Sequence, residues 1–118
     1  MNQIIGKVYL IDLFDCDYER VNSTKKIVNA LKKIVKESKL GLIKIITHEY
    51  EPQGVTGIAI IKESHIAIHS WPEHNFLSID IFSCSKKSLN LEKIISDAKN
   101  IFKANKATYK IISRPVIK

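Results

Sequence analysis

Three short apolar segments follow one another in the middle of the chain, and their close spacing restricts the fold more than any other feature. They are Val55 to Ile61, Ile66 to Trp71 and Phe76 to Cys84, and all have the composition typical of strands. Only short connections, around residues 63–64 and 72–75, separate them. Short connections favour antiparallel neighbours. The sequence therefore predicts an antiparallel sheet in this part of the chain.

Two amphipathic helices are predicted, one on each side of this region. The first covers about residues 23–38, where apolar residues recur at helical spacing, and Gly41 is expected to close it. The second has an apolar face made of Leu91, Ile94, Ile95, Ala98, Ile101 and Phe102. The candidate capping residues are Asn22 or Ser23 for the first helix and Ser88 or Asn90 for the second.

Three further strands are predicted at Ile4 to Phe14, Leu42 to Tyr50 and Ala107 to Ser113. The chain after Pro115 is expected to be loose. The order of strand, helix, several strands, helix and strand places the helices on one face of a mostly antiparallel sheet. The sequence therefore predicts one α+β domain over residues 1–118, built as a two-layer sandwich.

Between residues 55 and 69, apolar side chains occur at both odd and even positions, so apolar and polar residues do not alternate as they do in a strand with one face in water. A sheet that is apolar on both faces needs a second covering layer on the face that the helices leave open. We therefore expect a homodimer that packs sheet to sheet or edge to edge.

Composition argues against several classes of protein. The longest apolar runs are too short to span a bilayer, and no signal-peptide pattern is evident. Only Arg20 and Arg114 among the 19 basic residues are arginine, which disfavours sequence-specific binding of nucleic acid. Cys16 and Cys84 lie far apart and form no CxxC pair, which fits a reducing compartment. We expect a cytoplasmic protein without nucleic acid or membrane as a partner.

Polar residues gather in the run from Lys62 to Glu73, which is otherwise apolar enough to be buried. Ser64 is a candidate nucleophile because His65 and His69 offer nearby bases, although an ordinary turn serine is the plain alternative. A hydrolase triad is disfavoured because no GxSxG motif is present. A metal site that includes His74 is also disfavoured, since His65 and His69 lie too far apart along a strand to share an ion.

A wider set of motifs resembles a known family. Residues 52–57 read Pro-Gln-Gly-Val-Thr-Gly, residues 63–65 Glu-Ser-His, residues 69–73 His-Ser-Trp-Pro-Glu and residues 80–84 Asp-Ile-Phe-Ser-Cys. These motifs and their spacing resemble the short prokaryotic S-adenosylmethionine decarboxylases, which are pyruvoyl enzymes made as self-cleaving proenzymes. The close match covers residues 48–85, and chain length and helix placement agree along nearly the whole sequence.

The resemblance implies that the chain cuts itself between Glu63 and Ser64. Ser64 attacks the carbonyl of Glu63, the amide becomes an ester, and β-elimination then leaves residues 1–63 and 64–118. The new N-terminus becomes a pyruvoyl group, a covalent cofactor built from Ser64. This group forms a Schiff base with the substrate amine and accepts electrons when carbon dioxide leaves. The product would supply the aminopropyl group of spermidine-type polyamines.

The resemblance also implies roles for other residues and places the active site at or near the dimer interface. His69 matches the histidine that transfers a proton during processing, and Thr56 occupies the position of the family's processing serine. Cys84 matches the cysteine that protonates the carbanion after decarboxylation. The positions that match residues near the substrate's adenine and ribose are Tyr50, Trp71 and Glu73.

Three positions depart from the family pattern. Thr56 replaces a serine, Tyr50 replaces the usual phenylalanine, and Ser85 replaces a glycine. Relatives with the same proenzyme core decarboxylate arginine or ornithine, so a pyruvoyl-dependent arginine or ornithine decarboxylase is the alternative enzyme. An uncut homologue that acts as a partner or regulatory subunit is the alternative outside enzymes.

Overall fold

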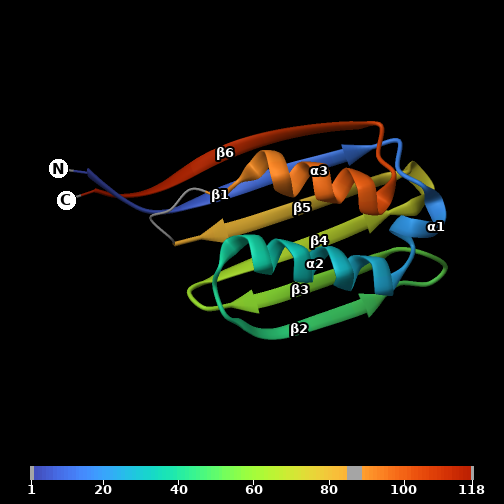
Figure 1. The fold of residues 1–118 in the computed structure, drawn as a ribbon, viewed down its shortest axis with the longest axis horizontal. Coiled ribbons are helices and arrows are strands. Elements are labelled where there is room, and N and C mark those ends of the chain that lie inside the picture. The colour runs from blue at the N-terminus through green and yellow to red at the C-terminus, as the bar shows by residue number, and fades with distance from the viewer. Residues whose placement is uncertain (1, 85–88, 118) are drawn as a thin grey trace.

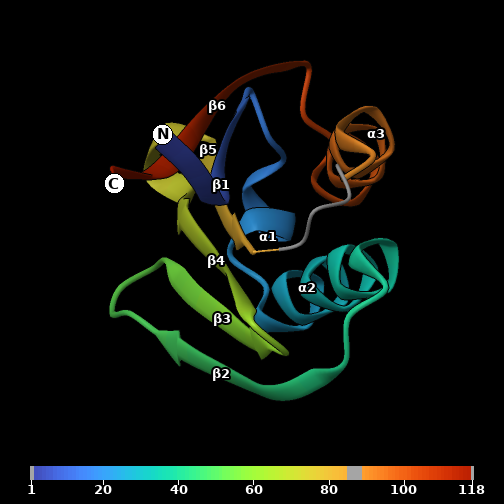
Figure 2. The same cartoon turned by 90° about the vertical axis from the view of Figure 1, so that its left-hand side faces the viewer.

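The computed structural model describes residues 2–84 and 89–117. The chain forms a six-stranded sheet with two long helices packed on one face (Figures 1 and 2). The elements are β1 (Asn2–Phe14), α1 (Tyr18–Val21), α2 (Thr24–Ser38), β2 (Leu42–Glu49), β3 (Val55–Ile61), β4 (Ser64–Trp71), the 3₁₀ helix η1 (Pro72–His74), β5 (Phe76–Ser83), α3 (Leu91–Phe102) and β6 (Lys106–Ile117). The predicted α+β two-layer sandwich is confirmed.

Neighbouring strands of the sheet are antiparallel throughout, in the order β2-β3-β4-β5-β1-β6. β3, β4 and β5 follow one another directly, as their short connections predicted. β1 and β6 join the sheet through the segments that contain the helices. Residues Ser64–Trp71 of the polar run therefore lie on β4, an interior strand with a partner on each side.

The face beneath the helices holds the hydrophobic core. Alternate strand residues such as Ile11, Ile66 and Ile79 are fully buried there. They pack against the apolar sides of α2 and α3, which bury residues such as Leu31 and Phe102. None of the helices in the described part of the chain is long and apolar enough to cross a membrane.

α2 begins and ends where predicted, but the residue that closes it is not the predicted one. The Ser23 hydroxyl accepts a hydrogen bond of 3.2 Å from the backbone N–H of Lys26, which caps the helix start. At the other end Lys39, with a φ of 60°, takes the left-handed conformation, and its N–H donates to the carbonyl of Lys36. Gly41 is therefore not the closing residue, because Lys39 adopts the backbone geometry that usually favours glycine.

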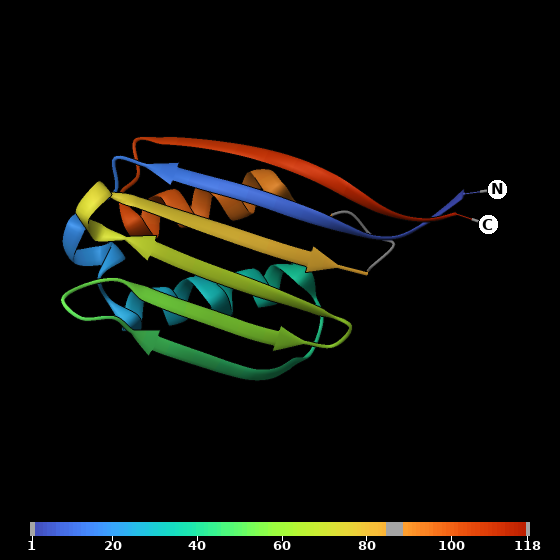
Figure 3. The same ribbon diagram turned by 180° about the vertical axis from the view of Figure 1, so that it is seen from behind.

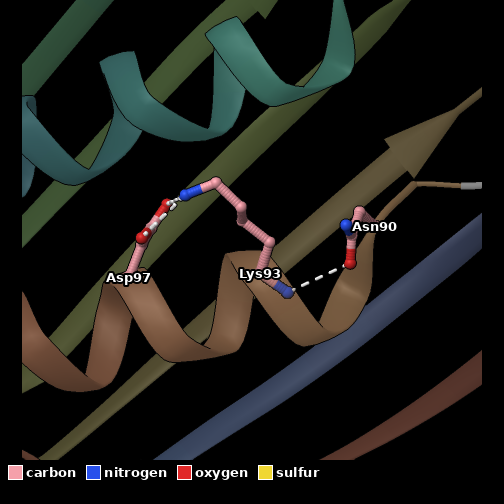
Figure 4. Close-up of polar contacts among 3 residues, drawn as sticks. All are labelled: Asn90, Lys93 and Asp97. Atoms are coloured by element: carbon pink, nitrogen blue, oxygen red, sulfur yellow. Dashed lines mark hydrogen bonds and ion pairs between the residues drawn. The ribbon is translucent and has the colours of Figure 1, made fainter.

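α3 is capped by Asn90, one of the two predicted candidates. Its side-chain oxygen accepts a hydrogen bond of 3.1 Å from the N–H of Lys93, and the Lys93 ammonium pairs with Asp97 one turn further on (Figure 4). The other candidate, Ser88, and the departure from the family pattern at Ser85 lie outside the described residues.

β6 is longer than predicted. It continues to Ile117 instead of ending at Ser113, because it pairs with β1 as far as Asn2. Pro115 lies opposite Ile4, and a proline fits there because β6 is an edge strand. The expectation of a loose tail is therefore wrong for the described part of that segment. Sequence periodicity also missed α1 and η1, which are too short to produce a helical pattern.

Figure 3 shows the face of the sheet that the two long helices leave open. One cross-strand row on this face is polar on all six strands: His48, Thr56, His69, Ser78, Asp12 and Thr108. Apolar residues in the two following rows include Ile46, Ile58, Ala67, Ile60, Phe82 and Ile112. The predicted two-sided apolar character of β3 and β4 is therefore present, but a polar row interrupts it near one end.

α2 packs against β3 directly over Gly57. A Cβ atom at this position would lie 2.6 Å from Cγ2 of Ile27 and 3.1 Å from Cδ1 of Leu31. Glycine is required here because any side chain would push the helix away from the strand. Thr56 precedes Gly57 and faces the opposite side, so this contact also fixes the strand that carries Thr56.

Replacing Gly57 with alanine should lower the free energy of unfolding by about 1–3 kcal/mol, the usual cost of overpacking a core. The measurement is urea denaturation at one fixed protein concentration, in chains that also carry Ser64→Ala to remove the expected cleavage. The matched control is Gly41→Ala, where an added Cβ has no neighbour within 4 Å. An unchanged unfolding midpoint for Gly57→Ala would contradict the close packing described here.

Candidate active site

The Glu63–Ser64 peptide lies in the tight turn between β3 and β4. Ile61 pairs with Ser64, which leaves Lys62 and Glu63 as the turn residues. Glu63 has a φ of 66°, in the left-handed region that costs a residue other than glycine about 1–2 kcal/mol. The Lys62 N–H donates to the carbonyl of Gly41 at 2.9 Å and ties the turn to the loop before β2. A strained residue therefore precedes the bond that is expected to be cut.

The Ser64 hydroxyl is buried and has a defined partner. The residue is 7% exposed, and its Oγ accepts a hydrogen bond of 3.3 Å from the backbone N–H of Cys84. Ser64 lies on the helix-covered face beside Ser83, while the Cys84 side chain, just after β5, is exposed. The structure thus brings the predicted nucleophile and the predicted proton donor together.

A cavity of about 290 Å³ opens at the other end of β3 and β4. Five predicted site residues line it: Tyr50, Thr56, His69, Trp71 and Glu73. Tyr50 and Trp71 are partly exposed, so their rings offer aromatic surface to a ligand. Glu73 supplies the carboxylate of the lining, and it sits in η1 directly after β4. This combination suits a small molecule that has both a flat ring and hydroxyl groups.

A chain of hydrogen bonds joins three of these side chains. Thr56 on β3 and His69 on β4 are direct cross-strand partners, with Thr56 Oγ1 3.1 Å from His69 Nδ1. The Tyr50 hydroxyl lies 3.1 Å from the same Thr56 oxygen. The hydroxyl–imidazole pair expected to assist processing is therefore formed.

The structure does not bring this pair to Ser64 within one chain. Ser64 and His69 are five positions apart on the same extended strand, a separation of about 17 Å at the usual rise per residue. They also face opposite sides of the sheet, since Ser64 points toward the helices and His69 toward the open face. One chain therefore carries two half-sites, one at each end of β4.

The remaining histidines of the motif region have other surroundings. The His65 ring stacks on Phe82 with a centroid distance of 5.7 Å, and His74 lies in η1. Across residues 2–84 and 89–117, no three His, Cys, Asp or Glu side chains are grouped closely enough to hold a metal ion.

Three further residues line the cavity that were not predicted from the sequence: Gln53, Gly54 and Ser70. Gly54 has a φ of 104°, and its N–H donates to the Asn22 side chain at 2.9 Å. The Ser70 hydroxyl accepts a hydrogen bond of 3.0 Å from the N–H of Val55. All three lie inside the quoted motifs, but a motif does not reveal that these groups hold the backbone of the cavity wall.

The two cysteines differ in environment. Burial, with a smaller contribution from the carboxylate of Asp15, raises the pKa of the Cys16 thiol to about 11. Cys84 is exposed beside Ser64, and both thiols are free. Cys84 is therefore the cysteine that a small molecule can reach.

Sequence comparison places the chain among known proteins. A model of the family described as S-adenosylmethionine decarboxylase matches residues 7–115. The S-adenosylmethionine decarboxylase proenzyme of Clostridium botulinum (strain Loch Maree / Type A3) is 39% identical over 109 residues, which cover 92% of this chain and 93% of that protein. The proenzyme of the same name from Prochlorococcus marinus (strain MIT 9313) is 36% identical over 86 residues, 73% of this chain and 69% of that protein.

Solved structures with the same fold carry related names. The crystal structure of the adenosylmethionine decarboxylase from Aquifex aeolicus VF5 superposes with a TM-score of 0.83 at 23% identity and covers 98% of this chain and 95% of that one. A Trypanosoma brucei AdoMetDC-delta26 monomer gives a TM-score of 0.64 at 18% identity, over 89% of this chain and 45% of that one. At these identities the likeness concerns the fold.

Alkylation with iodoacetamide at pH 8 should modify Cys84 rapidly and leave Cys16 intact. A thiol with a pKa of about 11 has roughly 0.1% of its molecules as the reactive thiolate at that pH, and Cys16 is also buried. Peptide mass mapping after timed quenching measures both rates, and Cys84→Ser is the control that should lose the fast reaction. Equal rates for the two cysteines in the folded protein would disprove the difference.

Proposed function

Because the chain belongs to the S-adenosylmethionine decarboxylase family, we propose that it is a proenzyme that cuts itself between Glu63 and Ser64 and then decarboxylates S-adenosylmethionine. The observation that carries the cleavage site is the left-handed backbone of Glu63 directly before Ser64.

The proposed cleavage uses the strain of this turn. The Ser64 Oγ attacks the carbonyl carbon of Glu63, and breakage of the amide bond converts it to an ester, which releases the left-handed constraint on Glu63. Elimination then breaks the Cβ–O bond of residue 64, and residues 1–63 leave with a carboxylate. Water replaces the nitrogen of residue 64, which departs as ammonia. This leaves a pyruvoyl group at the start of residues 64–118.

The surroundings of Ser64 fit such a group. Position 64 begins an interior strand, and the backbone N–H of Cys84 already donates to its side-chain oxygen. A pyruvoyl group there supplies an electrophilic carbonyl that accepts the electron pair released when carbon dioxide leaves. Cys84 is proposed to return a proton to the substrate carbon, since its thiol is exposed on the residue that contacts position 64.

The cavity at the opposite end of β4 is proposed to hold the nucleoside part of the substrate. Its aromatic residues, Tyr50 and Trp71, can pack on adenine, and Glu73 can accept hydrogen bonds from ribose hydroxyls. The family and the relatives named above are all described as S-adenosylmethionine decarboxylases, so the alternative of an arginine or ornithine decarboxylase gains no support. The product supplies the aminopropyl group for spermidine biosynthesis.

We further propose that the working unit is a homodimer, because each chain holds two separated half-sites. Two open faces that pack across a two-fold axis perpendicular to the strands would place the cavity end of one sheet over the Ser64 end of the other. The exposed apolar residues that such packing would bury include Ile46, Ile60 and Ile112. His69 and Thr56 of one chain would then act on the Glu63–Ser64 bond of its partner.

We propose a cytoplasmic location because both cysteines are free thiols. Cys16 and Cys84 are both free thiols in the structure, the form that a reducing compartment maintains.

The intact mass of the purified protein tests the cleavage. We expect two fragments divided between Glu63 and Ser64. The second should be lighter by one ammonia than a chain that begins with serine, and should differ from a dehydroalanine product by the replacement of NH with O. Release of carbon dioxide from carboxyl-labelled S-adenosylmethionine should accompany the cut form. Ser64→Ala should give one full-length mass and no release above background.

Arginine and ornithine, labelled in the same way, are the substrate controls for that assay. A wild-type chain that stays intact after prolonged incubation would reject self-processing and favour an uncut partner subunit. A cleaved Ser64→Ala chain would reject Ser64 as the nucleophile.

Mixing two inactive chains tests the shared site. Neither Ser64→Ala nor His69→Ala should be cut when expressed alone. When the two are co-expressed with different tags, only the His69→Ala chain should be cut, because its Ser64 can meet the intact His69 of the other chain. Fragment masses assigned by tag measure this directly.

His65→Ala is the matched control for this experiment, since His65 lies on the same face of β4 but stacks on Phe82 away from the cavity lining. It should be cut when expressed alone. A wild-type chain that is cut, together with no cut in the mixed sample, would reject the shared site while leaving self-processing in place.

A further inference from the structure

Tyr50 is held by three separate contacts although half of the residue is exposed. Its backbone N–H donates to the carbonyl of Gly54 at 2.8 Å. The ring of His48 meets its ring edge-on, with 4.7 Å between centroids. Its hydroxyl lies 3.1 Å from Thr56 Oγ1. The third contact is the only one of these that uses the phenol oxygen, and a tyrosine that only stacks on a ligand would not need it.

The Thr56 hydroxyl lies between two partners, the Tyr50 hydroxyl and Nδ1 of His69, each 3.1 Å away. A hydroxyl has one proton to donate and can accept from other groups. Thr56 can donate to His69 Nδ1, donate to the Tyr50 hydroxyl, or accept from both partners. Nδ1 of His69 is the acceptor only when Thr56 donates to it.

The chemistry of the three groups selects one arrangement. A phenol is a stronger acid than an aliphatic hydroxyl, so it is the better hydrogen-bond donor of the two. With Tyr50 donating to Thr56, the Thr56 proton is free to point to His69 Nδ1, and only an accepting Nδ1 lets both hydroxyl protons take part in the chain. The proton of the neutral ring is left on Nε2.

We propose that Tyr50 is a positioning residue for self-processing: through Thr56, its phenol holds His69 in the tautomer with the proton on Nε2. This inference rests on the proposed function, in which Thr56 and His69 assist the cut. Fixing Nδ1 as an acceptor leaves Nε2 as a hydrogen-bond donor for the Glu63–Ser64 peptide of the partner chain. Removing the phenol oxygen frees the Thr56 hydroxyl to rotate, so both tautomers become populated.

The tautomer can be read without any cleavage. Nitrogen-15 NMR of the histidine side chains in the uncut Ser64→Ala protein should show His69 with a protonated Nε2 and an unprotonated Nδ1 at a pH where the ring is neutral. Adding Tyr50→Phe should move both nitrogen shifts toward averaged values. Identical His69 shifts with and without Tyr50→Phe would overturn the proposal, and His69→Ala assigns the signals.

Cleavage rates test whether the arrangement matters for processing. Tyr50→Phe should slow self-cleavage about three- to tenfold, the equivalent of one hydrogen bond. Thr56→Val removes the middle of the chain, so adding Tyr50→Phe to it should cause no further loss. Independent, multiplicative losses in the double variant would overturn the proposal. Tyr109→Phe, an exposed tyrosine on β6, is the control and should keep the wild-type rate.

Substrate kinetics separate this role from stacking. Tyr50→Phe retains the ring, so a change in the KM of the cut enzyme for S-adenosylmethionine would report a contact of the phenol oxygen with substrate, whereas a slower cleavage reports its role in processing. A raised KM with an unchanged cleavage rate would make Tyr50 a substrate contact alone and overturn the proposal. A wild-type chain that never cuts would reject the proposed function instead, and the NMR comparison would still decide the tautomer.

Discussion

The pairing register of β3 and β4 is the constraint on which the rest of the site depends. It places Ile61 opposite Ser64 and Thr56 opposite His69, so that one hairpin sets both the turn before the nucleophile and the hydroxyl–imidazole pair. A slip of one residue would turn every side chain of a strand to the other face. Ser64 would then leave the buried side and lose the N–H of Cys84, while His69 would enter the core. Burial on the helix-covered face thereby sets the register, and the register decides which polar side chains lie on the open face.

One face of the sheet packs against the helices, and the other carries the polar row that includes Thr56 and His69. α2 packs closely against Gly57, and this contact holds β3 in place. The neighbouring residue Thr56 faces the other side of the sheet and belongs to the polar row. The open face carries polar groups where the cavity lies and apolar groups beyond it, so the part suited to a ligand and the part suited to a second chain are adjacent. Side chains that line the cavity can change without disturbing the core, since the helices contact the other face.

Sequence alone was sufficient for the fold class and the central hairpins, and it narrowed each helix cap to two residues, because periodicity and capping chemistry are local properties. The structure selected Ser23 and Asn90 from those pairs. Sequence gave Gly41 in place of Lys39 as the residue that closes α2, because a lysine in the left-handed conformation leaves no sequence signal. The length of β6 was missed because its last residues are strand only through pairing with β1. Motifs suggested the candidate site residues, but not that Ser64 and His69 occupy opposite ends and faces of one strand. That separation follows from the extended geometry of β4, which a motif does not encode.

The separation of the half-sites gives the proposed proenzyme an order of events. A lone chain holds Ser64 buried, with its oxygen engaged by Cys84, and keeps the imidazole of His69 about 17 Å away. The strain at Glu63 is present in that chain, yet strain alone provides no proton transfer. Under the proposed dimer, the imidazole reaches the strained peptide only after two folded sheets have met. Folding and association would then precede the cut, and no chain would acquire its electrophile before its substrate cavity was in place.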